Sequence, residues 1–139
     1  MLELTIGHLA RESGVKTDTI RYYETLKLIE PVGRTGSGYR LYDDSSVDRI
    51  IFILRSKSLG FKLSEITALL ELQASETATC ESMLQTTKTK ILEAKENIEY
   101  LSRLRTALES LASECPGGGQ PLSDCPILEY LNLKSMKGV

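Results

Sequence analysis

Residues 79–115 contain neither glycine nor proline, the two residues that most often end or bend a helix. Apolar side chains recur along this stretch near the a and d positions of a heptad repeat, which is typical of a helix that packs against another helix. We therefore expect one helix over residues 79–114, which at 1.5 Å per residue is ~54 Å long. Its apolar stripe consists of Leu84, Ile91, Ile98, Leu101, Leu104, Leu108 and Leu111.

A helix of this length cannot bury its apolar stripe against the rest of a 139-residue chain. The simplest partner is the same helix in a second copy, so the sequence predicts a homodimer joined by a coiled coil. The alternative is a bent helix that packs on itself. A heptad repeat does not fix the direction of pairing, so the antiparallel arrangement used below is an assumption.

The segment before the long helix has the pattern of a helix-turn-helix followed by a wing. A short helix over 6–11 stops at Ser13-Gly14, and a second helix begins with Thr17 as its expected N-cap. Residues 29–42 contain three glycines and end in the sequence YRLY, which predicts a small β-hairpin. Two further helices are expected, one from about residue 44 to Gly60 and one over 63–72.

The predicted fold class is therefore all-α with a small β wing. We expect a winged helix-turn-helix DNA-binding domain over residues 1–73, and a hinge with the dimerisation helix over 74–114. Residues 115–139 would form a metal-binding loop and a short C-terminal helix.

Charge is distributed unevenly along the chain. Residues 11–62 contain ten Lys or Arg against seven Asp or Glu, whereas residues 63–139 contain seven against eleven. A basic front joined to an acidic back fits a DNA-reading segment attached to another module, although chance scatter gives the same pattern. The N-terminus does not resemble a signal peptide, and no apolar run reaches the ~18–20 residues of a membrane span. We therefore expect a cytoplasmic protein with no membrane contact.

Two of the three cysteines, Cys115 and Cys125, flank a loop rich in glycine and proline. Pro126 predicts a last short helix with Cys125 as its N-cap. In a reducing compartment thiols serve more often as ligands or reactive groups than as structural disulfides. Cys80 taken alone fits a small buried apolar residue as well as it fits a ligand.

Cys80 and Cys115 lie at opposite ends of the expected helix, roughly 50 Å apart, so they cannot bind one ion within a chain. In an antiparallel dimer, each of two symmetric sites would take Cys115 and Cys125 from one subunit and Cys80 from its partner. Ser123, Asp124 or a water are further possible ligands. Trigonal coordination by three thiolates suits mercury, cadmium or lead, whereas zinc usually takes four ligands.

The only histidine, His8, is far from the cysteine loop in the sequence. It is expected on the first helix as a surface or packing residue.

Nearly the whole chain carries a recognisable pattern. It comprises TIGHLARESGVKTDTIRYYETLKLIEPVGRTGSGYRLY, then VDRIIFILRSKSLGFKLSEITALLEL, and then the cysteines with CPILEYL. TIRYYE followed by a Gly-rich stretch and YRLY is specific, and with it the chain resembles the MerR family of metal-responsive transcription regulators. The resemblance implies a dimer on a palindromic operator, between promoter elements spaced too far apart for RNA polymerase. Effector binding would undertwist and kink the DNA, realign the elements and activate a heavy-metal resistance or efflux promoter.

The resemblance also assigns residues. Cys80 implies a divalent ion, because monovalent copper sensors carry Ser at that position. Zinc sensors usually carry a second Cys beside the first loop Cys and a loop His, which are absent here, so cadmium, lead or mercury is favoured. The nine-residue loop, however, matches zinc sensors better. Lys62 stands where relatives often have a Ser N-cap, which weakens the start of that helix by up to ~1 kcal/mol.

The resemblance also implies which residues contact DNA. They are Lys16, Thr17, Thr19, Arg21 and Tyr22 on the second helix and Arg34, Tyr39 and Arg40 on the wing. Most of them are expected to contact phosphates, and Arg21 is the candidate for a base contact. Tyr23 and Tyr42 are expected in the core.

The same residues bear on three other regulatory functions and on catalysis. A thiol redox switch through a Cys115–Cys125 disulfide stays open as an alternative. An iron–sulfur sensor needs four clustered cysteines, and a multidrug-binding regulator needs a large C-terminal domain, whereas about fourteen residues follow Cys125. No Ser/His/Asp set or phosphate-binding loop is recognisable, so we do not expect an enzyme.

Overall fold

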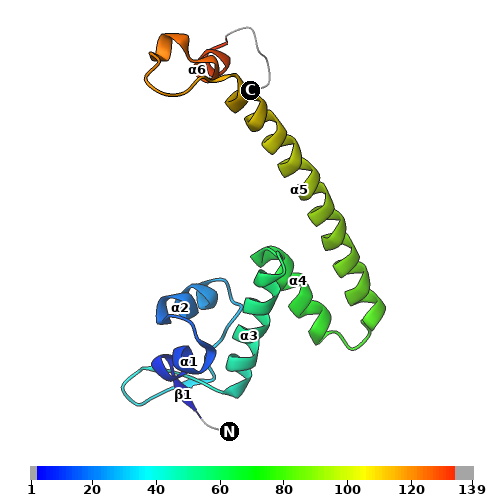
Figure 1. The fold of residues 1–139 in the computed structure, drawn as a ribbon. Helices are drawn as coiled ribbons and strands as arrows, with labels where there is room; N and C mark the ends of the chain where they lie inside the picture. The colour runs from blue at the N-terminus through cyan, green and yellow to red at the C-terminus, as the bar shows by residue number, and fades with distance from the viewer. Residues whose placement is uncertain (1–2, 134–139) are drawn as a thin grey trace. The chain divides into compact units, whose positions relative to one another are not determined.

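The computed structural model describes residues 3–133 of the chain. It contains two compact units, Met1–Thr87 and Lys88–Val139, and each is described by itself. Figure 1 shows the helices and strands in order along the chain. Their bounds in the N-terminal unit are β1 (Leu4–Thr5), α1 (Ile6–Ser13), α2 (Thr17–Thr25), β2 (Gly33–Arg34), β3 (Arg40–Tyr42), α3 (Asp44–Ser58) and α4 (Leu63–Ala74).

The N-terminal unit contains a helix-turn-helix and a small antiparallel sheet, as the sequence predicts. The strand order is β1-β3-β2, so β3 lies in the middle and pairs with both neighbours. The wing hairpin is β2 and β3, and β1 is an additional strand that the sequence analysis did not find. A strand of two residues is too short to show the alternating pattern by which strands are recognised.

The turn between α1 and α2 depends on Gly14. Gly14 adopts a left-handed φ of 74° and donates its N–H to the Ala10 carbonyl at 2.9 Å, which ends α1. The expected N-cap of α2 at Thr17 is wrong by one residue. Lys16 is the N-cap, because its carbonyl already accepts from the N–H groups of Thr19 and Ile20 at 3.0 and 3.3 Å. The lysine side chain cannot accept a hydrogen bond, so the first turn of α2 has no side-chain cap.

One hydrophobic core holds the helices and the sheet of this unit together. Tyr23 and Tyr42 are almost completely buried, which confirms their predicted place in the core. Burying side chains of this size is the main favourable contribution to folding. The other fully buried side chains come from all four helices and are Leu9, Ile20, Ile50, Ile53 and Ile66.

Helix α4 begins without a side-chain cap. Its N-cap is Lys62, whose ammonium group has no lone pair to offer to the first free N–H groups. The Glu65 carboxylate accepts from the Lys62 N–H at 2.8 Å, which is one half of a capping box. Lys62 is therefore the N-cap, as expected, and the weaker helix start that it implies stays a prediction.

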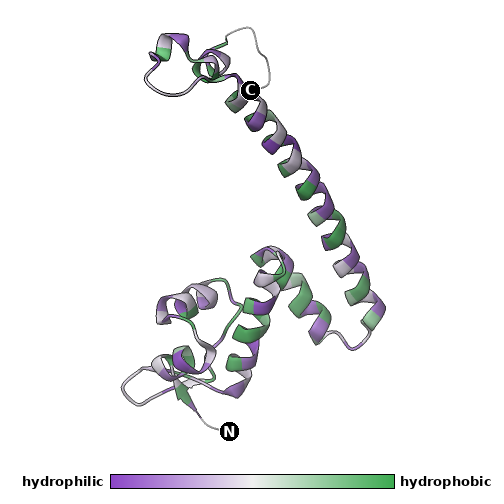
Figure 2. Cartoon of the chain, viewed as in Figure 1, coloured by the Kyte–Doolittle hydropathy of each residue, from purple (hydrophilic) through white to green (hydrophobic). Residues whose placement is uncertain are grey.

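Helix α5 (Cys80–Glu114) is continuous over 35 residues and buries none of them. Its bounds match the sequence prediction to within one residue. Green residues recur along the helix in Figure 2, and they mark its apolar stripe. The large apolar side chains that are 41–67% exposed are Leu84, Ile91, Leu92, Ile98, Tyr100, Leu101, Leu104 and Leu108.

After α5, the described part of the C-terminal unit contains a 3-10 turn, η1 (Leu122–Asp124), and a short helix, α6 (Pro126–Leu131). Pro126 occupies the first helical position and Cys125 is the N-cap, as the sequence predicts. None of the helices within residues 3–133 combines the length and the hydropathy that a membrane-spanning segment requires.

Candidate nucleic-acid interface and cysteine loop

A hollow of about 270 Å³ lies where the second helix of the helix-turn-helix meets the wing. Three arginines from three elements line it: Arg21 from α2, Arg34 from β2 and Arg40 from β3. Ile6, Gly38 and Tyr39 complete the lining, and we call this set the arginine hollow. The fold therefore brings together four of the eight residues assigned to DNA contact. Their placement gives the site a concentrated positive charge with planar hydrogen-bond donors.

The wing places two like charges opposite each other. Arg34 and Arg40 are direct cross-strand partners in the β2–β3 register. Like charges in this position destabilise a hairpin unless each finds an acceptor. Arg34 Nη1 donates to the Gly38 carbonyl at 3.0 Å, and Arg40 Nε lies 3.3 Å from Glu24 Oε2 on α2.

The tip of the wing is a tight turn with its own hydrogen bonds. The Thr35 N–H donates to the Tyr39 carbonyl at 2.8 Å, and the Tyr39 N–H donates to Thr35 Oγ1 at 3.0 Å. Gly38 has a φ of 91°, a value that residues with a Cβ atom rarely adopt. The turn leaves the Tyr39 ring 71% exposed at the rim of the arginine hollow.

The remaining assigned residues lie on or next to α2. Lys16 and Tyr22 are exposed, and Thr17 and Thr19 are half-buried. Arg21 pairs with Asp18 one turn earlier at 3.0 Å, and both side chains are exposed. An exposed pair of this kind contributes about 0–1 kcal/mol, so it holds Arg21 only weakly.

A carboxylate that the sequence analysis did not single out links α2 to β3. Glu24 Oε1 accepts a hydrogen bond from the Tyr42 hydroxyl, while Glu24 Oε2 faces Arg40. Burial, the hydrogen bond to Glu24 and the negative charge of Glu24 raise the pKa of Tyr42 far above its usual value, so Tyr42 stays a donor. The available signal is the spacing of Glu24 four residues after the buried Ile20, which puts a charge on the core side of α2.

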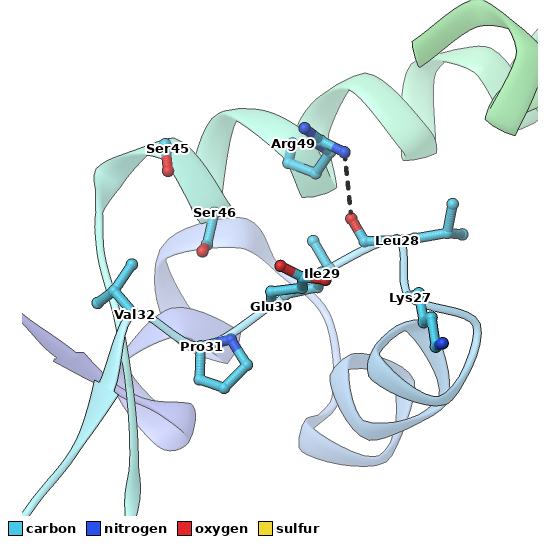
Figure 3. Close-up of a pocket in the computed structure, with 9 residues that line it drawn as sticks. All are labelled: Lys27, Leu28, Ile29, Glu30, Pro31, Val32, Ser45, Ser46 and Arg49. Atoms are coloured by element: carbon cyan, nitrogen blue, oxygen red, sulfur yellow. Dashed lines mark hydrogen bonds between the residues drawn. The ribbon is translucent and has the colours of Figure 1, made fainter. Parts of the chain in front are cut away.

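The segment that joins α2 to the wing is fixed to α3. In Figure 3, Arg49 of α3 points at the Leu28 carbonyl, to which its Nη1 donates at 3.4 Å. Leu28 and Ile29 are buried, which anchors the segment in the core. A polar hollow of about 430 Å³ lies beside it, and its lining contains no cysteine.

The cysteines do not assemble within the described chain. Cys80 is the first residue of α5 and is exposed, whereas Cys115 and Cys125 are half-buried in the C-terminal unit, and all three are free thiols. Among residues 3–133, no three His, Cys, Asp or Glu side chains lie close enough together to hold a metal ion. His8 is exposed on α1, as expected. Between the two loop cysteines, Gly117 and Gly118 take left-handed φ values of 70° and 62°, which lets the chain reverse after α5.

A helix-turn-helix with a wing and an arginine-lined junction defines a winged helix-turn-helix protein. Comparison with known proteins gives the family. The family model "MerR HTH family regulatory protein" matches residues 4–73, and the model "MerR, DNA binding" matches residues 47–111. The chain belongs to the MerR family of helix-turn-helix transcription regulators and is not an enzyme.

Two curated relatives and one solved structure match most of the chain. The mercuric resistance operon regulatory protein of Bacillus cereus is 41% identical over 133 residues, which cover 96% of this chain and 100% of that protein. The regulator HmrR of Rhizobium leguminosarum bv. viciae is 39% identical, with 93% and 98% covered. The structure of PbrR691 from Ralstonia metallidurans CH34 in complex with lead(II) has a TM-score of 0.82 at 28% identity, with 92% and 98% covered.

Tyr42→Phe should lower the free energy of unfolding by about 1–2 kcal/mol below pH 10, because Glu24 loses a buried donor. The raised pKa of Tyr42 gives this difference a pH dependence. Stability that depends on a protonated Tyr42 is complete below the unfolded tyrosine pKa of about 10 and decreases as the pH rises above it. Wild type and variant should therefore converge above pH 10 in urea unfolding at fixed protein concentration. Tyr39→Phe, at an exposed ring, is the control, and a constant difference at all pH values would contradict the assignment.

Proposed function

We propose that the chain is a metal-responsive transcription regulator that binds operator DNA as a homodimer and activates a heavy-metal resistance or efflux promoter. The observation that carries the DNA-binding part is the arginine hollow at the junction of α2 and the wing. The metal-responsive part draws on two similar proteins, one a mercuric resistance operon regulator and the other crystallised with lead(II).

In this proposal α2 is the recognition helix and the wing contacts the DNA backbone. Arg34 and Arg40 bind phosphates, and the exposed Tyr39 covers the sugar–phosphate backbone beside them. Arg21 reads a base edge once DNA replaces Asp18 as its partner, because a guanidinium pairs with guanine through two hydrogen bonds. The other contacts of the recognition helix are assigned to Lys16, Thr17, Thr19 and Tyr22.

The exposed stripe of α5 supports dimerisation through a coiled coil. Antiparallel pairing would put the N-terminal end of each α5 beside the C-terminal end of the other. Cys115 and Cys125 of one subunit then meet Cys80 of the partner subunit, which completes a three-thiolate site. The proposed organisation is a DNA-binding domain over 1–73, a hinge and dimerisation helix over 74–114 and a metal loop with its short helix over 115–139.

The donor set favours a soft divalent ion. Three thiolates without a histidine suit cadmium, lead or mercury, whereas zinc would need a fourth ligand such as Asp124, Ser123 or a water. Metal binding would act through α5 on the two DNA-binding domains. The altered contacts of the two domains with DNA deform base pairs that the protein does not touch. This deformation realigns the promoter elements for RNA polymerase.

A thiol redox switch is the second candidate. Cys115 and Cys125 are both free and half-buried in the same unit, on either side of a loop with two left-handed glycines. This favours a Cys115–Cys125 disulfide as the alternative signal. Titration of free thiols with an oxidant in the absence of metal separates the two candidates, since only the redox switch loses two thiols and changes transcription under those conditions.

Arg34→Ala should weaken binding to operator and to unrelated DNA by the same factor, because a phosphate contact carries no sequence information. The slope of log affinity against log salt should fall in magnitude by about 1, the effect of one phosphate contact. Arg21→Ala should instead lose affinity mainly for the operator, by roughly 5–100-fold. Fluorescence anisotropy with both duplexes measures these effects, with exposed Lys95→Ala on α5 as the control. Equal losses for both duplexes in Arg21→Ala would contradict its role in base recognition.

Cys80→Ser should leave operator affinity within about twofold of wild type, because the substitution lies outside the helix-turn-helix and the wing. It should abolish activation of a reporter promoter across zinc, cadmium, lead and mercury at controlled free concentration. In vitro transcription with purified RNA polymerase provides the measurement. A full metal response in this variant would remove Cys80 from the ligand set.

A further inference from the structure

Glu24 joins two of the elements that line the arginine hollow, α2 and β3. It lies on α2, and both of its carboxylate oxygens contact β3, one at the Tyr42 hydroxyl and the other at Arg40 Nε, 3.3 Å away. Arg40 and Tyr42 are two residues apart on the strand, so their side chains leave the same face. One side chain of α2 therefore fixes the wing strand at two points.

The environment of Glu24 makes this link stronger than an exposed ion pair. The Glu24 side chain is only 12% exposed, against 41% for Arg40, so the carboxylate is more buried than the guanidinium with which it pairs. A partly buried charge pair is less screened by salt than a surface pair. The Tyr42 hydroxyl is itself buried and fixes the carboxylate from the other side.

The charges around the hollow need such a group. Arg40 lies opposite Arg34 in the hairpin, and Arg21 lines the same hollow from α2. Arg34 is held by the Gly38 carbonyl, and Arg21 is held by Asp18. Glu24 is the acceptor that holds Arg40. Without Glu24, repulsion by Arg21 and Arg34 would favour positions of the Arg40 guanidinium farther from them.

We propose that Glu24 is a positioning residue for DNA binding: by pairing with Arg40 from a more buried position, it presents the guanidinium to a DNA phosphate. This inference rests on the proposed DNA-binding function. The link from Glu24 to β3 makes α2 and the wing one rigid unit. The position of the recognition helix then determines which part of the DNA backbone the wing contacts.

The sign of the effect separates positioning from simple charge. Glu24 is an acidic residue next to a phosphate-binding surface, so Coulomb repulsion alone predicts that its neutralisation tightens DNA binding. Positioning predicts the opposite result. Glu24→Gln keeps the shape of the side chain and an oxygen that can accept from Tyr42, but it has no charge to hold Arg40.

The experiment measures operator affinity against salt for the full chain carrying Glu24→Gln, Arg40→Gln or both. Glu24→Gln should bind about tenfold more weakly than wild type, and its salt slope should fall in magnitude by about 1. Arg40→Gln should show the same loss, and the double variant should be no worse than Arg40→Gln alone. This non-additivity is a readout that a purely structural role would not produce, because independent losses add.

Two further variants serve as controls. Glu12→Gln removes an exposed carboxylate from α1, outside the arginine hollow, and its affinity reports the effect of charge alone. Glu24→Asp keeps the charge but withdraws it by one methylene, and it replaces Glu24→Gln in the cycle if thermal melting shows that Glu24→Gln does not fold.

Three outcomes are decisive. Tighter operator binding by Glu24→Gln, or additive losses in the double variant, would overturn the positioning role. Failure of wild type to prefer operator DNA over unrelated DNA would instead contradict the proposed function itself.

Discussion

The proposed dimer and its shared metal site depend on the exposed apolar stripe of α5. This helix buries none of its 35 residues, and its large apolar side chains are 41–67% exposed along most of its length. Removing this surface from water is the main gain available to the chain after its N-terminal core has formed. A second copy of α5 supplies an apolar surface with the same heptad repeat. The proposed dimer therefore follows from the exposed apolar side chains of α5.

The same helix gives the cysteines their proposed arrangement. A continuous helix lies between Cys80 and the loop of Cys115 and Cys125, and no three metal-binding side chains gather within residues 3–133. A site shared by two subunits makes metal binding depend on how the two helices pair. This is the property that a sensor needs if an ion at the loop is to change the grip of two DNA-binding domains. In each DNA-binding domain, the link from Glu24 to Arg40 and Tyr42 would keep α2 and the wing in a fixed relation. A change in how the two α5 helices pair would then move α2 and the wing together on the DNA.

Much of the fold could be predicted from sequence because its signals are local. The absence of glycine and proline predicted α5, Pro126 predicted the start of α6, and Gly14 marked the turn before α2. The N-cap at Lys16 was missed because its backbone carbonyl, rather than a capping side chain, begins the helix. The strand at Leu4–Thr5 was missed because two residues carry no period.

The candidate sites were predictable to different extents. The resemblance to the MerR family placed Arg21, Arg34 and Arg40 in one interface, and the fold brings them around one hollow. Glu24 was missed because its partner Arg40 lies on a strand sixteen residues away. The spacing from Ile20 places Glu24 on the core side of α2 but does not show which residues it contacts. The three-cysteine site stays a prediction, since completing it requires a second chain. Its most direct test is a heterodimer of Cys80→Ser and Cys115→Ser chains, with bound cadmium counted per dimer. The account predicts one ion, because both substitutions fall in the same composite site, whereas a heterodimer that binds none would contradict the shared site.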